Sequence, residues 1–183
     1  VVPRINMIPN LQSERLKLRP FKPEDAARVQ KLAGEKIIAE MTENIPHPYL
    51  DGMAESWIDK HESWYQNRVA AVFAMVIRQT DELIGAISFT QIEEQTGNLG
   101  YWVGLPYWGN GYCTEASGLL LEFGFNQFGL SQIYARHLAK NPASGRVITK
   151  NGFHYLTAEV VVGRNVKHYE LKKLQWQSLH KTE

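Results

Sequence analysis

The order of hydrophobic and polar residues predicts a strand and two helices in the first third of the chain. Residues 15–19 alternate basic and apolar side chains with a period of two, which is typical of a half-buried strand. Pro23 fits the first turn of a helix whose apolar residues recur at helical spacing to about Gly34. The segment 37–50 is irregular and contains a proline-rich loop at 44–49. A second amphipathic helix is expected over residues 51–67.

The rest of the chain predicts a sheet interrupted by helices. Strands at 70–78, 83–91 and 98–104 follow one another with turn residues between them, which indicates an antiparallel meander. Beyond it we expect a glycine-rich loop at 106–114, a helix at 115–128, a strand at 131–138, a helix at 142–151, and strands at 153–162 and 167–176. The order βααβββαβαββ predicts one mixed α/β domain over residues 1–183, with a mostly antiparallel sheet.

Composition narrows the possible partners. The chain carries 20 basic and 19 acidic residues, so its net charge of +1 provides no global field for nucleic acid or a membrane surface. The sequence lacks an apolar run of membrane-spanning length, and its start lacks the pattern of a secretory signal. The six histidines are scattered, without the spacings that bind metal. We therefore expect a cytoplasmic protein with no metal.

Cys113 is the only cysteine, which excludes an intrachain disulfide. A catalytic thiol needs an activating base, and no histidine or lysine stands beside Cys113 in the sequence. We expect a small residue at a tight turn, and a thiol enzyme remains the alternative.

A glycine-containing turn links the predicted strand at 98–104 to the following helix. Gly109 and Gly111 let backbone N–H groups converge, and the helix N-terminus adds partial positive charge, so the turn can hold a phosphate or pyrophosphate. The Gly-Lys-Ser/Thr of a Walker loop and the third glycine of a dinucleotide fingerprint are both missing, which disfavours ATP and NAD. Taken alone, the segment also suits an ordinary strand-to-helix turn.

A second polar segment, residues 141–153, begins where another predicted strand ends. Asn141 offers a donor and an acceptor, Pro142 fits a first helical turn, and the Ser144 hydroxyl can reach across that turn. A plain helix cap is the alternative role for Asn141.

Together these segments resemble the GNAT superfamily of acyl-CoA-dependent N-acetyltransferases, particularly the RimJ/RimL type that acetylates protein N-termini. The resemblance covers nearly the whole chain. It rests on several ordered motifs: residues 15–20 with 24–26, the Pro46-His47-Pro48-Tyr49 loop, Gly100-Tyr101-Trp102, the segment 107–112, Thr114-Glu115-Ala116, and residues 141–153.

The resemblance implies acetyl-CoA as cofactor and a sheet splayed between its fourth and fifth strands, where the pantetheine arm pairs with residues 99–104. The family's pyrophosphate loop maps onto Trp108, Gly111 and Cys113, so only its central glycine is kept. The cofactor-binding residues implied are Tyr101, Trp102, Val103, Trp108, Gly109, Asn110, Gly111, Tyr112, Cys113, Thr114, Asn141 and Ser144.

The implied reaction is attack of an amine on the acetyl thioester. The resemblance gives Val103 the backbone N–H for the oxyanion, Ser144 the proton for the leaving thiolate, and Asn141 an orienting role. The family often places an acid in the segment matching 160–165, where this chain has none. The candidate general bases are therefore Glu93, Glu94, Glu159 and His137, besides a water chain or capture of the neutral amine.

Acceptor specificity is expected from the region between the first two helices, including Glu40, His47 and Tyr49. Glu40 and Glu43 could attract a cationic amine, or they could be solvated charges at a helix end. The expected partners are acetyl-CoA and an amine, either a protein N-terminus of the ribosomal-protein type or a small molecule, with no nucleic acid or membrane. A domain that binds acyl-CoA without turnover is the competing interpretation, and the protein is expected as a monomer or homodimer.

Overall fold

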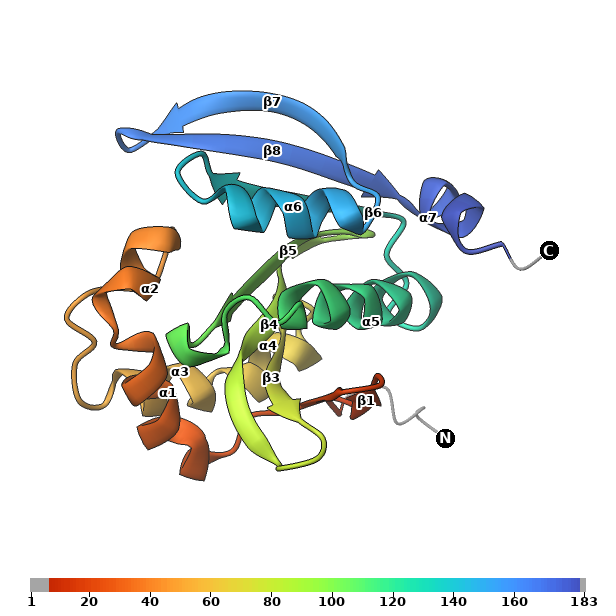
Figure 1. The fold of residues 1–183 in the computed structure, drawn as a ribbon. Helices are drawn as coiled ribbons and strands as arrows, with labels where there is room; N and C mark the ends of the chain where they lie inside the picture. Colours follow the sequence, from red (N-terminus) through yellow and green to blue (C-terminus); the bar gives the residue numbers. More distant parts are fainter. Residues whose placement is uncertain (1–6, 182–183) are drawn as a thin grey trace.

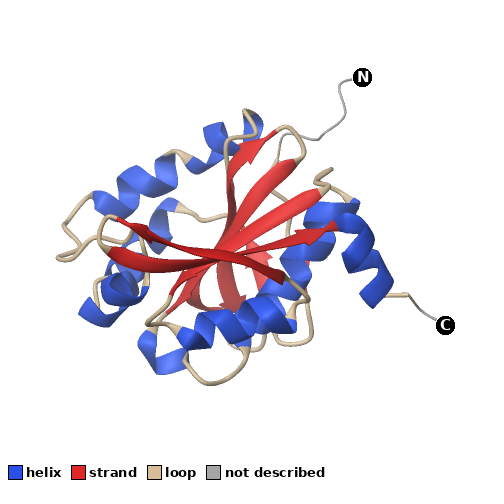
Figure 2. Ribbon diagram, turned by 90° about the horizontal axis from the view of Figure 1, so that it is seen from above, coloured by secondary structure: helices blue, strands red, loops and turns tan. Residues whose placement is uncertain are grey.

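The computed structural model describes residues 7–181, which form one eight-stranded sheet between helices (Figures 1 and 2). The strand order is β1-β2-β3-β4-β5-β6-β8-β7, and every neighbouring pair is antiparallel except β5 and β6. The strands are β1 Leu11–Gln12, β2 Leu16–Arg19, β3 Ala71–Ile77, β4 Glu82–Glu93, β5 Thr96–Val103, β6 Gln132–Leu138, β7 His154–Val161 and β8 Arg164–Lys172. The mixed α/β class and the meander of β3 to β5 are confirmed.

The helices divide between the two faces of the sheet. They are α1 Ala26–Ala33, α2 Lys36–Met41, α3 Met53–Asp59, α4 His61–Gln66, α5 Tyr112–Asn126, α6 Pro142–Lys150 and α7 Lys173–Leu179. Residues of α1 and α3 form one core cluster with the side chains that β3 and β4 direct to that face, such as Val72 and Ala86. Residues of α5 form the other cluster with alternate strand residues such as Phe73 and Ile87. Both faces of β3 are therefore buried. No helix in the described part of the chain is long and apolar enough to cross a membrane.

The predicted splay of the sheet is present at β5 and β6. These strands pair in parallel from Thr96 with Gln132 to Leu99 with Ala135, and their pairing stops there. β5 continues to Val103 and β6 to Leu138, so a gap opens between their carboxyl ends. Because the helix α5 connects the two strands, its N-terminus lies at this open edge of the sheet (Figure 1).

Three local predictions were wrong. The irregular segment 37–50 begins with the short helix α2, which forms because Ile38 buries its side chain, at 2% exposure. The predicted helix over 51–67 is interrupted at Lys60, whose N–H bonds to Trp57 O with i to i−3 spacing. The predicted strand over 167–176 ends at Lys172, because the Gln175 side chain accepts the Lys172 N–H at 2.9 Å and begins α7.

Candidate active site

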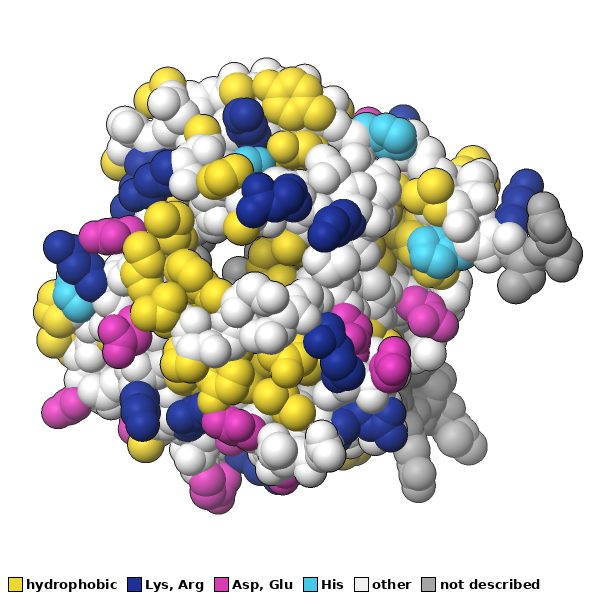
Figure 3. Space-filling model, viewed as in Figure 1, with side chains coloured by type: hydrophobic (Ala, Val, Ile, Leu, Met, Phe, Trp, Pro, Cys, Tyr) yellow, Lys and Arg dark blue, Asp and Glu magenta, His cyan; other side chains and the backbone are white. Residues whose placement is uncertain are grey.

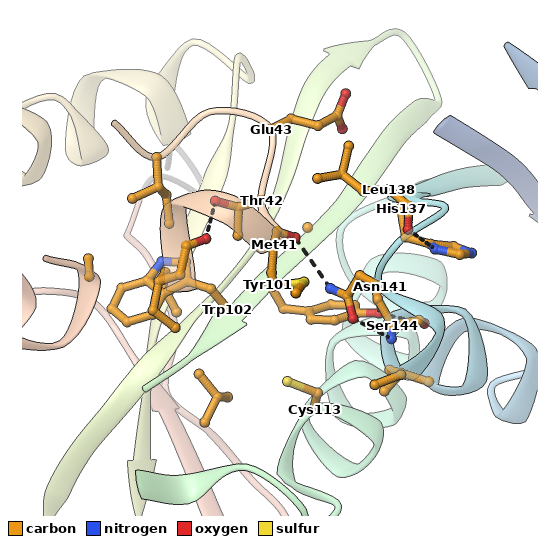
Figure 4. A pocket seen from close by; sticks show the side chains of 18 of the residues that line it. Met41, Thr42, Glu43, Tyr101, Trp102, Cys113, His137, Leu138, Asn141 and Ser144 are labelled. Carbon is orange, nitrogen blue, oxygen red and sulfur yellow. Dashed lines mark hydrogen bonds between the residues drawn. The ribbon is translucent and has the colours of Figure 1, made fainter. Parts of the chain in front are cut away.

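A cavity of about 990 Å³ occupies the gap between β5 and β6 and continues beneath the loop that follows α2. The surface is visibly hollowed near the centre of Figure 3, and Figure 4 shows side chains from both sides of the sheet pointing into the cavity. All twelve predicted cofactor residues line it together: Tyr101, Trp102, Val103, Trp108, Gly109, Asn110, Gly111, Tyr112, Cys113, Thr114, Asn141 and Ser144. The fold therefore brings together two segments that lie about 30 to 40 positions apart in the sequence.

The backbone of β5 directs hydrogen-bonding groups into the gap. The Gly104 N–H bonds to Ile84 O at 2.8 Å, which fixes the alternation of groups along β5. In an antiparallel pair, residues alternate between facing the partner and facing away, so Trp102 bonds toward β4 while Tyr101 and Val103 face away from β4. The N–H groups of Tyr101 and Val103 thus point toward the unpaired edge, where an extended ligand can pair with them.

The Trp108 indole occupies the backbone carbonyl of Val103 at this edge. Its Nε1–H donates to Val103 O at 2.7 Å, although the ring is 43% exposed. Trp108 is the first residue of the segment that the resemblance maps onto the pyrophosphate loop, and its indole donates a hydrogen bond within the site. The Val103 N–H remains directed at the gap.

The glycine turn adopts the conformation expected of an anion site. Gly109 and Gly111 have φ values of 78° and 76°, in the left-handed region that glycine enters without strain. Gly111 is the N-cap of α5, and no side chain caps this helix end. The first N–H groups of α5 are therefore directed at the cavity with the positive end of the helix dipole.

Arg15 and Glu115 brace this turn, and sequence reasoning missed both roles. The Arg15 guanidinium donates to Asn110 O at 2.8 Å and to Glu115 at 2.7 Å, and it lies 4.6 Å from the centre of the Tyr112 ring. Glu115 also accepts from Ser13 Oγ at 2.6 Å. These hydrogen bonds hold the pKa of Glu115 below its usual value despite its partial burial. No local pattern reveals them, because the partners lie about 100 residues apart.

Asn141 and Ser144 meet Tyr101 at the end of the gap (Figure 4). The Asn141 side chain accepts the Ser144 N–H at 3.3 Å as the N-cap of α6, and it donates to Met41 O at 3.3 Å. It therefore caps one helix and ties it to another. The Ser144 hydroxyl lies 2.8 Å from the Tyr101 hydroxyl, whose pKa is raised by burial. Two protonated hydroxyls thus stand at one point of the cavity.

Cys113 lines the cavity from the first turn of α5. Burial raises the pKa of its thiol to about 12, so the thiol stays protonated near neutral pH. A protonated thiol is a poor nucleophile, which argues against the thiol-enzyme alternative.

The structure places the predicted acceptor residues in two different spaces. Tyr49 lines the cavity, whereas Glu40 and His47 line a neighbouring surface depression of about 540 Å³. Glu40 forms an ion pair with Lys36 at 3.7 Å, and Glu43, which lines both spaces, pairs with Arg136 at 2.8 Å. Both acids therefore already have a basic partner within the protein.

The candidate general bases are mostly remote from the cavity. Glu159 pairs with His168 at 2.8 Å on the β7–β8 hairpin, and Glu93 and Glu94 lie at the far end of β4; none of the three lines the cavity. His137 does line it, but its Nδ1 donates to Leu138 O at 2.8 Å and its Nε2 accepts from Tyr169 Oη at 3.1 Å. Among the described lining residues the only carboxylate is Glu43, which is ion-paired.

Comparison with known proteins agrees with this geometry. A family model described as an acetyltransferase (GNAT) domain matches residues 15–154. An uncharacterized N-acetyltransferase, YoaA of Bacillus subtilis, is 31% identical over 156 residues, covering 80% of this chain and 84% of the relative. RimJ of Mycobacterium smegmatis, solved in complex with a CoA-disulfide, superposes with a TM-score of 0.83 at 18% identity, covering 96% of this chain and 91% of RimJ. RimL, described as a ribosomal L7/L12 α-N-protein acetyltransferase in complex with coenzyme A, superposes with a TM-score of 0.81 at 16% identity, covering 90% and 98%.

Proposed function

This chain belongs to the acetyltransferase (GNAT) family and is an N-acetyltransferase with acetyl-CoA as cosubstrate, and from that premise we propose that it acetylates the N-terminal α-amino group of a protein of the ribosomal type. The observation that carries the proposal is the continuity of the site with the surface. The cavity and the neighbouring depression share the lining residues Glu43, Asn44, Ile45, Pro46 and Lys140. A chain end can therefore reach the thioester while the residues that follow it lie in the depression. The description of RimL as an α-N-protein acetyltransferase supports the same class.

In the proposed mechanism the β5 edge and the α5 N-terminus hold the cofactor. The Tyr101 backbone would hold the pantetheine arm in the gap, with the acetyl carbonyl at the Val103 N–H, and the turn that contains Gly109 and Gly111 would donate hydrogen bonds to the pyrophosphate. The neutral amine attacks the carbonyl carbon of the thioester, and the Val103 N–H stabilises the oxyanion that forms.

Collapse of the tetrahedral intermediate releases the thiolate of coenzyme A, which needs a proton. Ser144 supplies it in our proposal, while Tyr101 passes its own proton to Ser144 and water returns a proton to Tyr101. Asn141 keeps Ser144 in place by capping α6. The ammonium proton of the attacking amine leaves through water, because the described cavity lining offers no unpaired carboxylate.

We further propose that residues 1–183 act as one acetyltransferase domain in the cytoplasm, as a monomer or homodimer. A protein N-terminus of the ribosomal type is available in that compartment, and the described residues share a single sheet.

A calorimetric titration with acetyl-CoA, followed by a thiol-release assay over peptides and small amines, tests the proposal. We expect binding, and release of coenzyme A that depends on a peptide α-amine. Turnover of small amines alone would favour the small-molecule alternative. Binding without release for any acceptor would favour a non-catalytic acyl-CoA module, a reading motivated by the ion-paired state of Glu43.

A further inference from the structure

The part of the cavity opposite the cofactor turn is an apolar chamber. We define the acceptor chamber by six of its lining residues: Ile38, Met41, Ile45, Tyr49, Trp57 and Trp102. They come from α2, the loop after it, α3 and β5, on the face of the sheet that α1 and α3 cover. Five of the six are only half-buried although each lines the cavity, Ile38 being the exception. When an apolar ligand covers apolar surface inside a cavity, that surface is removed from water, which favours binding.

The chamber also lacks what a polycationic acceptor needs. A di- or polyamine requires carboxylates for its second charge, because an unpaired ammonium group is costly to desolvate. The only described carboxylate that lines the cavity, Glu43, forms an ion pair with Arg136 at 2.8 Å. The amine substrate therefore brings an apolar substituent into the chamber, with no second cation beside it.

The entrance is cationic. The depression outside the chamber is lined by Lys36, Glu40, Glu43, Lys140 and Arg164 among others. The two acids are paired with Lys36 and Arg136, whereas neither Lys140 nor Arg164 has a carboxylate partner among the described residues. Arg164 donates to Thr42 O at 2.9 Å, which holds its charge beside the loop after α2. Lys140 is exposed and lines both the cavity and the depression.

We infer that the acceptor is an N-terminus whose first residue has a large apolar side chain and whose next residues are acidic, and this inference rests on the proposed function. The first side chain occupies the acceptor chamber, the α-amine faces the gap between β5 and β6, and the following carboxylates lie against Lys140 and Arg164. The arrangement reverses the sequence-based idea that Glu40 and Glu43 attract a cationic amine.

Steady-state kinetics with matched synthetic peptides test this inference on the wild-type protein. The set combines Met or Ser at the first position with two Asp, two Ser or two Lys at the next positions, and spermidine serves as the polycation. We expect the Met-Asp-Asp peptide to have the highest kcat/KM and the Met-Lys-Lys peptide and spermidine the lowest. A preference for Lys over Asp, or for spermidine over the peptides, would overturn the inference while leaving acetyl transfer intact. No turnover of any peptide would instead refute the proposed function, and the inference with it.

Two variants locate the preference in the named residues. Lys140→Glu should lower kcat/KM for the Met-Asp-Asp peptide by about five- to tenfold, with little effect on the Met-Ser-Ser peptide and a smaller effect at high salt. Lys31→Glu makes the same charge change on an exposed lysine outside both spaces and should behave as wild type. An equal loss for both peptides, or a rise in the KM for acetyl-CoA, would assign Lys140 to the fold or the cofactor and overturn its role here.

Ile45→Ala tests the chamber in the same way. Ile45 lies in the loop after α2, half-buried, so a smaller side chain can be accommodated without disturbing the sheet. We expect about a tenfold loss of kcat/KM for the Met-first peptide and little change for the Ser-first peptide, the size expected for removing apolar contacts in a specificity pocket. An equal change for the two peptides would contradict the chamber assignment.

Discussion

Replacing Gly111 by valine tests the cofactor turn directly. Gly111 has a φ of 76°, a conformation that a β-branched residue adopts only under strain. A Cβ atom built there lies 3.6 Å from Nη2 of Arg15, the side chain that donates to Asn110 O at 2.8 Å. Valine would therefore disfavour the left-handed conformation and place its side chain against the residue that braces the turn.

Two magnitudes follow from this geometry. The backbone strain of a non-glycine residue in this region costs about 1–3 kcal/mol of stability. If the turn relaxes to relieve the strain, at least one N–H···phosphate hydrogen bond is lost, and a bond to a charged group contributes about 1.5–3 kcal/mol. We therefore expect the dissociation constant for acetyl-CoA to rise about 10- to 150-fold.

Gly52 offers a matched control. It is also a helix N-cap in the left-handed region, with a φ of 83° and no atom within 4 Å of a built Cβ, and it does not line the cavity. Gly52→Val should thus lose similar stability in chemical denaturation but bind acetyl-CoA as wild type does in calorimetry. An unchanged dissociation constant for Gly111→Val, together with the expected loss of stability, would refute the placement of the pyrophosphate at this turn.

Three further predictions follow from the structure. Ser144→Ala should lower kcat by about 100-fold in the thiol-release assay, because proton donation contributes to the transition state, while the dissociation constant for acetyl-CoA changes little. Thr149→Ala, on the same helix but outside the cavity, should leave kcat unchanged. An equal loss in both variants would show that Ser144 acts only through helix packing. Burial raises the pKa of the Cys113 thiol to about 12, so this thiol should react with iodoacetamide at pH 8 far more slowly than free glutathione does. Cys113→Ala should retain turnover. Abolished turnover in this variant would restore the thiol-enzyme alternative. His61 is buried with neither ring nitrogen hydrogen-bonded, and desolvation lowers its pKa from 6.5 to about 4. As the pH drops, the unfolded chain therefore binds a proton at His61 before the folded protein does. The free energy of unfolding should fall by about 2–3 kcal/mol between a pH above 6.5 and pH 4. His61→Phe should remove that part of the pH dependence in urea unfolding, whereas parallel stability curves for the two proteins would show that His61 does not titrate in this window.

Much of the fold could be predicted from the sequence because hydrophobic periodicity reports which face of an element is buried. Residues 15–19 followed that rule, and their alternation matches the observed strand β2, whereas the meander of β3 to β5 was predicted from its β-forming residues and the turns between them. The rule failed where burial came from distant partners. Leu174 lies within the strand predicted over 167–176, but it is 78% exposed, since the Gln175 side chain ends the strand and Trp176 packs as part of a helix.

The candidate site also contains some features that could be predicted from the sequence and others that could not. Gly109 and Gly111 were recognisable as a tight turn because positive φ angles favour glycine, and Asn141 was recognisable as a possible helix cap because its position after a strand and before a proline is typical of one. The roles of the predicted acceptor residues could not be recognised from the sequence, because a carboxylate in a sequence does not reveal its ion-pair partner. Glu43 looked like a binding group for a cation until the fold placed Arg136 beside it at 2.8 Å.

The sequence by itself therefore predicted most of the strands and helices, the glycine turn and, through its resemblance to a family, the type of reaction, since each depends on local conformation or on motifs that neighbouring residues form. Only the tertiary structure decided which charges are already paired, which hydroxyls meet in the cavity, and what Arg15 braces. The physical reason is that these properties are sums over contacts between residues far apart in the chain, as between Arg15 and Glu115 or between Tyr101 and Ser144.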